Sequence, residues 1–299
     1  YNKENIQMYS RDNFISSFVI YLIFFMVLFC IYKTYILSKR VSACNKLHFT
    51  CASIGDAKRF ESSITSSLYS YEVMYYDDER MKLLVSEFGE KVMAAFNCVK
   101  PFAYKADIFR LCALIKYGGL YLDADIRARE GKLNSFINFE KEYIFLRENK
   151  NVTDEIPYLK KPFYKVALWQ AFLYCKRPRS SVMTQILHNI VDRVLAPNLE
   201  EIHSFNNSKS QTLVTLYFTG PIAVGEFGLK EFGIPDWYST SSLYKVQMFD
   251  FYGNNIHTHK HISILGKDDT AQKLSKPTHY HNMFLSKGID GLICKNIMT

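Results

Sequence analysis

The chain has 299 residues, of which 48% are hydrophobic and 22% charged, a composition that suits one large globular domain or two small ones. An aromatic content of 15% excludes a disordered chain, because so many rings can bury far more surface than a solvated tail carries. The 37 basic residues outnumber the 29 acidic ones and give a net charge of +8, which favours anionic partners such as phosphates or membrane surfaces. This charge is too diffuse to indicate nucleic acid binding, and we expect none.

An apolar run near the start of the chain predicts a membrane anchor. Residues 13–32 contain no charge, and as a helix they would span roughly 30 Å, the thickness of a bilayer core. We therefore expect a tail over residues 1–12, a transmembrane helix over 13–37, a stem over 38–45 and one domain over 46–294. A cleavable signal peptide ending near Ala43 is the alternative, although its apolar part would span only about 7–15 residues.

The compartment of the domain is left open by the residues themselves. More basic residues follow the apolar run than precede it, which by the positive-inside rule would place the domain in the cytoplasm. Seven cysteines are present without any C-x-x-C pair, so neither a zinc ribbon nor a thioredoxin motif is indicated.

Strand and helix patterns alternate along the remainder of the chain. Strands are expected at residues 46–50, 71–76, 119–122 and 246–250, and helices at 56–69, 78–88, 103–117, 166–175 and 181–195. This alternation predicts an α/β fold with a mostly parallel sheet flanked by helices.

The helix expected at residues 103–117 carries an acid on its inner side. At about 100° per residue, Lys105 and Lys116 mark the solvent face, whereas Asp107 points nearly opposite, with Arg110 one turn further on. A surface ion pair would contribute only about 0.2–0.5 kcal/mol and would not explain an acid among apolar residues. Because burying an acid is costly unless a partner meets it, we interpret the two as a ligand-contact pair.

Two glycines and two acids follow this helix directly. Gly118 can end the helix in a left-handed conformation, and Gly119 permits a tight turn into the apolar strand. Asp123 and Asp125 then lie on the same side of an extended backbone, where their mutual repulsion favours a cation between them. Oxygen ligands at a strand's carboxyl end suit Mn²⁺ or Mg²⁺ bridged to a diphosphate.

Residues 106–125 match the pattern A-D-x-x-R-x-x-x-L-x-x-Y-G-G-x-Y-x-D-x-D. This pattern resembles the sugar-binding DxD region of retaining glycosyltransferases with the GT-A fold. It is most similar to glycosyltransferase family 32, the family of the yeast initiating α-1,6-mannosyltransferase, the inositol-phosphoceramide mannosyltransferases and an α-1,4-galactosyltransferase, and clostridial glucosylating toxins share it. Four other segments resemble the same family: Leu47–Phe49, Tyr75–Asp78, Thr219–Pro221 and His279–Asn282.

The resemblance implies roles for particular residues. Asp107 and Arg110 would hold the donor sugar and its phosphate, and Asp123 would contact ribose or sugar and the metal. Asp125 would be the direct metal ligand, and His279 is a candidate metal ligand or phosphate contact. Further donor contacts are implied at His48, Phe49, Gly119 and Tyr121. The chain departs from the family at His281, where Trp is usual, at Gln170, where Asn is usual, and at residues 176–179, which lack a His.

We therefore expect a single-pass, Mn²⁺- or Mg²⁺-dependent retaining glycosyltransferase that moves a hexose from a UDP- or GDP-sugar to a glycan or glycolipid. We expect a protein of the Golgi or endoplasmic reticulum with its catalytic domain in the lumen, although the charge count would place the domain in the cytoplasm, so the orientation is left open. An inactive binding protein with the same fold is an alternative. A DxD phosphatase is disfavoured, because Arg127 occupies the position where that class has Thr or Val and two strands precede the motif.

Overall fold

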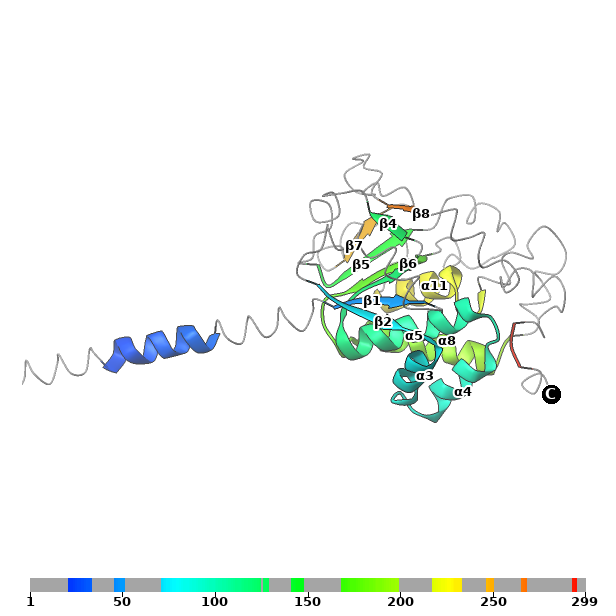
Figure 1. Ribbon diagram of the computed structural model, residues 1–299, viewed down its shortest axis with the longest axis horizontal. Coiled ribbons are helices and arrows are strands. Elements are labelled where there is room, and N and C mark those ends of the chain that lie inside the picture. Colours follow the sequence, from blue (N-terminus) through cyan, green and yellow to red (C-terminus); the bar gives the residue numbers. More distant parts are fainter. Residues whose placement is uncertain are drawn as a thin grey trace, which may run out of the picture. The chain divides into compact units, whose positions relative to one another are not determined.

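The computed structural model describes ten segments of the chain (Figure 1). These are residues 21–33, 46–51, 71–124, 126–128, 141–147, 168–198, 217–232, 246–249, 265–267 and 292–294. The chain divides into two units, Tyr1–Ala43 and Cys44–Thr299.

In the first unit, residues 21–33 form a helix whose large apolar side chains are exposed. None of the helices within the described segments is both long and apolar enough to cross a membrane. Residues 13–20 and 34–37 of the predicted anchor lie outside the described residues, so the anchor stays a prediction.

The second unit is built on a six-stranded sheet with the order β2-β1-β3-β6-β5-β7. Its strands are β1 (Lys46–Thr50), β2 (Glu72–Tyr76), β3 (Gly119–Asp123), β5 (Tyr143–Arg147), β6 (Leu168–Cys175) and β7 (Val246–Phe249). β1 pairs in parallel with β2 and β3, and β5 with β7, whereas β6 is antiparallel to both β3 and β5. The sheet is therefore mostly parallel, as predicted. A separate pair joins β4 (Ile126–Ala128) to β8 (Leu265–Lys267).

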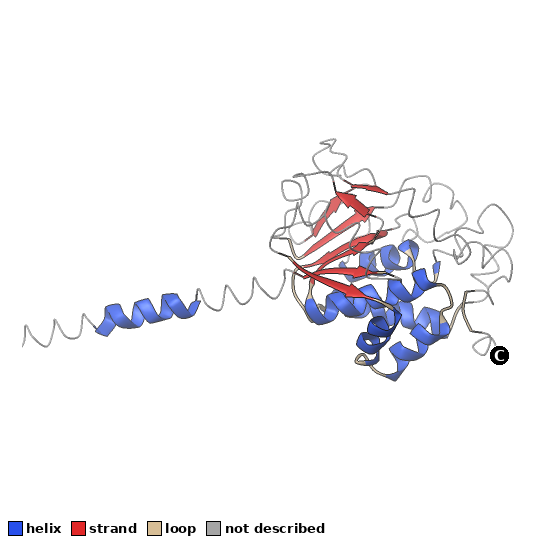
Figure 2. Cartoon of the chain, in the orientation of Figure 1, coloured by secondary structure: helices blue, strands red, loops and turns tan. Residues whose placement is uncertain are grey.

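The helices that the structure describes in this unit lie on one face of the sheet (Figures 1 and 2). They are α3 (Asp78–Ser86), α4 (Glu90–Cys98), α5 (Phe102–Tyr117), α8 (Ser181–Leu195) and α11 (Pro221–Phe232). Two of them begin at side-chain caps, because Asp77 accepts from the Arg80 amide and Ser180 from the Met183 amide. The mixed α/β architecture fits the GT-A fold that the resemblance implied.

Side chains alternate across the sheet and form two apolar clusters. Tyr121 belongs to the cluster that packs against the helices, whereas its neighbours Leu120 and Leu122 pack on the opposite face. α5 lies in the middle of the helical layer, in contact with β1, β3 and β6. Its inner face is therefore brought against β3, the strand that carries Asp123.

The helix predicted at residues 166–175 is wrong, because this segment contains the strand β6. All eight of its residues are buried, so the sequence shows neither a two-residue nor a 3.6-residue repeat. The strand β5 and the helix α4 were not predicted, and the helix expected at 56–69 lies outside the described residues.

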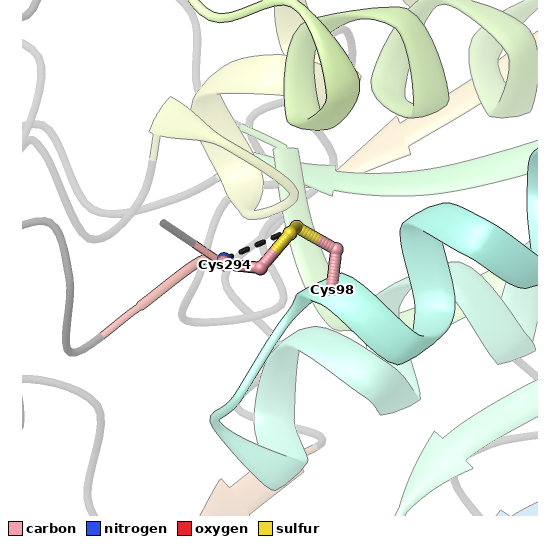
Figure 3. The surroundings of a disulfide bond; sticks show 2 residues. All are labelled: Cys98 and Cys294. Atoms are coloured by element: carbon pink, nitrogen blue, oxygen red, sulfur yellow. Dashed lines mark hydrogen bonds between the residues drawn. A yellow bond between two sulfur atoms is a disulfide. The ribbon is translucent and has the colours of Figure 1, made fainter. Parts of the chain in front are cut away.

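A disulfide joins distant parts of the second unit (Figure 3). It links Cys98, the last residue of α4, to Cys294, which lies 196 positions later in the sequence. Beside it, the Lys100 amide donates to the Leu292 carbonyl over 2.9 Å, and Leu292 and Ile293 are buried. The segment 292–294 is thus fixed to the end of α4 by covalent, polar and apolar contacts.

Candidate active site

The turn between α5 and β3 sets the position of the site. Gly118 and Gly119 have φ angles of +67° and +93°, a region that favours glycine. A Cβ on Gly119 would lie 2.2 Å from the Lys46 carbonyl oxygen, so β3 approaches β1 more closely than any other residue would permit. Nε2 of His48 lies 2.9 Å from the Gly118 carbonyl oxygen and ties the turn to β1.

α5 presents an ion pair to the interior. Oδ1 of Asp107 lies 3.0 Å from Nη2 of Arg110, and both side chains are buried. Nε of Arg110 also donates to the Ala106 carbonyl over 3.1 Å, which orients the guanidinium along the helix. Both residues thus lie inward, where the helical period placed them.

The same guanidinium reaches the carboxyl end of β3. Nη2 of Arg110 lies 3.4 Å from Oδ1 of Asp123, and the guanidinium stacks 4.5 Å above the Tyr121 ring. The Tyr121 hydroxyl donates to the same Asp123 oxygen over 2.9 Å and lies 2.8 Å from the Thr50 hydroxyl. Asp123 keeps 31% of its side chain exposed, so this end of the cluster opens to solvent.

Thr219 completes the cluster from a distant part of the chain. Its hydroxyl donates to Oδ2 of Asp107 over 2.7 Å, and its carbonyl accepts from Nε2 of Gln170, also over 2.7 Å. Thr219 was not among the predicted site residues, and the signal that pointed to it was the resemblance of Thr219–Pro221 to the T-G-P segment of the family.

Burial governs the electrostatics of the cluster. It raises the pKa of Asp107 to about 7, although Arg110 and the Thr219 hydroxyl both favour the ionised carboxylate. It also raises the pKa of Tyr121 well above its ordinary range, so the phenol stays a neutral hydrogen-bond donor. The pKa of His48 is lowered by burial to about 4, which keeps its imidazole neutral near pH 7.

The other predicted site residues lie elsewhere or outside the described segments. His48 is fully buried and bonds to Gly118 and Tyr76, and Phe49 stacks 6.0 Å from Tyr75 on the opposite face of the sheet. Asp125 and His279 are outside the described residues. Within the segments that the structure describes, no three His, Cys, Asp or Glu side chains are grouped to hold a metal ion.

Comparisons with known proteins bear on this cluster. Residues 55–142 match a family model described as "Glycosyltransferase sugar-binding region containing DXD motif", and this range includes Asp107, Arg110, Asp123 and Asp125. A solved structure, "PaToxG Glycosyltransferase", aligns with this chain at 15% sequence identity and a TM-score of 0.40. The alignment covers 67% of this chain and 76% of the chain in that structure. None of the curated proteins searched matches the sequence. The family-model match confirms the prediction that this chain is a glycosyltransferase with a DXD sugar-binding region.

Proposed function

We propose that the chain is a membrane-anchored, metal-dependent, retaining hexosyltransferase that uses a UDP- or GDP-sugar and a glycan or glycolipid acceptor. The observation that carries this proposal is the connected cluster of Asp107, Arg110 and Asp123, which ends at the partly exposed carboxylate of the first acid of the DxD motif. The matched sugar-binding region gives the class of reaction, and the cluster supplies groups for a sugar and for phosphates.

The cluster suits a nucleotide sugar because its charges are fixed before the ligand arrives. Asp107 offers a carboxylate that accepts from sugar hydroxyls, and Arg110 offers a guanidinium that can pair with phosphate. Breaking the bond between sugar and phosphate develops negative charge on the leaving diphosphate. A fixed cation near that charge stabilises the transition state more than the ground state.

The acids fit a divalent cation. Among the described residues, the contacts of Asp123 with Arg110 and Tyr121 both fall on Oδ1, which leaves Oδ2 of the partly exposed side chain for a ligand. Carboxylate oxygens are the ligands that Mn²⁺ and Mg²⁺ prefer, so Asp123 and Asp125 would hold the ion, with His279 as a candidate third ligand. A bound ion would add positive charge against the leaving diphosphate.

We further propose that the domain lies in the lumen of the secretory pathway, with residues 13–37 as its anchor. The Cys98–Cys294 disulfide supports this orientation, because disulfides persist in oxidising compartments and are rare in the cytosol. This argument opposes the count of basic residues around the apolar run. Protease protection of the domain in sealed microsomes would test the orientation, and cleavage of the domain without detergent would contradict it.

The central experiment is donor hydrolysis by the detergent-solubilised chain. We expect one member of a panel of UDP- and GDP-sugars to be hydrolysed when Mn²⁺ is added and to be spared when the metal is chelated. Asp125→Ala should abolish this turnover, and nuclear magnetic resonance of the first product should show the anomeric configuration of the donor. Undiminished turnover by Asp125→Ala would refute the metal-dependent mechanism, and donor binding without hydrolysis would indicate an inactive binding protein.

A further inference from the structure

We propose that Thr219, braced by Gln170, is a positioning residue that fixes the carboxylate of Asp107 for donor binding. The inference rests on the proposed function of Asp107 in holding the donor. It adds two residues, Gln170 on β6 and Thr219 two positions before the start of α11, to a site otherwise made from α5 and β3.

The two oxygens of Asp107 are held from two directions. Arg110 contacts Oδ1 from the same helix, and Thr219 donates to Oδ2 from a segment 112 positions later. The terminal torsion of an aspartate is broad and has no single preferred angle, so one contact leaves the carboxylate plane free to rotate. The second contact fixes the plane and therefore the directions in which the oxygens accept hydrogen bonds.

The position of Thr219 is itself fixed by contacts, so its hydroxyl can orient the Asp107 carboxylate. It is fully buried, and Gln170 donates to its carbonyl over 2.7 Å. Two residues earlier, the Tyr217 carbonyl accepts from Nη1 of Arg193 over 2.9 Å, and the Arg193 guanidinium stacks 4.2 Å above the Tyr217 ring. Arg193 also pairs with Glu226 on α11. The segment before α11 is thus anchored to both β6 and α8.

The chemistry of both side chains argues against a purely structural role. The helix α11 begins after Gly220, whose carbonyl accepts from the Val224 amide, so the Thr219 hydroxyl does not cap this helix. It donates instead to a carboxylate on another helix. Gln170 is buried, and among the described residues no hydrogen-bond partner reaches its Oε1. An unpaired amide oxygen in the interior is costly, so an apolar residue would pack there more favourably. What this glutamine supplies is the donor to Thr219.

The test compares Thr219→Val with Thr219→Ser in the full chain in detergent. Valine keeps the shape and removes the hydroxyl, whereas serine keeps the hydroxyl. Calorimetric binding of the nucleotide sugar and Mn²⁺-dependent hydrolysis are both measured. We expect the valine variant to raise the donor Kd and KM by about 10- to 100-fold, as for a lost hydrogen bond to a charged group, and the serine variant to stay within about threefold. Gln170→Met should shift the donor Kd in the same direction.

Three controls separate positioning from folding. Thr184→Val removes a hydroxyl on α8 that donates to the Ser180 carbonyl, and it should leave donor binding unchanged. In an Asp107→Asn background, Thr219→Val should add no further loss, because the two residues act as one unit. Thermal unfolding of every variant shows whether a loss of affinity follows a loss of fold.

The outcomes are distinct for the inference and for the proposed function. Wild-type donor affinity in Thr219→Val would overturn the inference, and so would a loss of equal size in Thr219→Ser. An unchanged donor Kd in Gln170→Met would show that Gln170 does not hold Thr219 in position. A wild-type chain that binds no nucleotide sugar would refute the proposed function and the inference with it. A chain that binds the donor without hydrolysis would still test the positioning through Kd.

Discussion

Asp107 carries a carboxylate in the interior, and its ionisation sets a limit on the pH range of the site. Burial raises its pKa to about 7, so protonation begins near neutral pH in the chain without ligands. A protonated Asp107 no longer pairs with Arg110 and loses acceptor capacity toward sugar hydroxyls. We expect kcat/KM for donor hydrolysis to fall as the pH drops below about 7, because the ionised form is the competent one. Asp107→Asn should be weakly active without this acid limb, and a limb that persists in the variant would assign the titration to another group.

Tyr121 orients Asp123 through a neutral phenol. Tyr121→Phe removes the donor to Asp123 and leaves the buried Thr50 hydroxyl without its tyrosine partner. We expect a drop of about tenfold in metal-dependent kcat/KM with the fold retained. Tyr143→Phe is a matched control, because it removes a similar buried hydroxyl that bonds to Ser180 instead. Equal losses in both variants would show that Tyr121 acts on stability alone.

At the scale of elements, the turn between α5 and β3 depends on a close approach of two backbones. Gly119→Ala would place its Cβ 2.2 Å from the Lys46 carbonyl oxygen at a φ of +93°, and we expect a loss of more than about 2 kcal/mol in the free energy of unfolding. Gly89→Ala offers the matched control, because Gly89 has the same φ but open space around the added Cβ. Urea unfolding measures both. If the two variants lose equal stability, the approach to Lys46 contributes nothing beyond backbone strain.

The elements also show which local patterns determine structure. α5 and β3 were predicted with nearly correct bounds, because the helix ends at two glycines and the strand is short and apolar. The sequence of β6 predicts a helix instead, because a strand buried on both faces between two partners has no polar positions to reveal its period. Whether a segment has a strand on each side is a property of the whole fold. This property, and not the local sequence, made residues 168–175 a strand.

At the scale of the whole molecule, one covalent link closes most of the domain. Removing the Cys98–Cys294 disulfide by Cys98→Ser should lower the free energy of unfolding by about 2–5 kcal/mol, because the link restricts the unfolded chain over 196 positions. Urea unfolding with and without reductant measures this loss. Reductant should destabilise the wild type to the level of the variant and leave the variant unchanged. A wild type that does not respond to reductant while its unfolding stays reversible would mean that the two cysteines do not pair in solution.

The sequence alone determined the class of enzyme and the placement of Asp107, Arg110 and Asp123 in the site. The inward direction of Asp107 and Arg110 and the position of Asp123 at the end of a buried strand follow from the repeat of a helix and a strand, which act over a few residues. Three features were decided only by the tertiary structure: the Thr219 hydroxyl on Asp107, the Gln170 amide on Thr219 and the pairing of Cys98 with Cys294. Each joins residues at least 49 positions apart, and local propensity carries no information over that distance, because such contacts exist only once the helices have packed on the sheet.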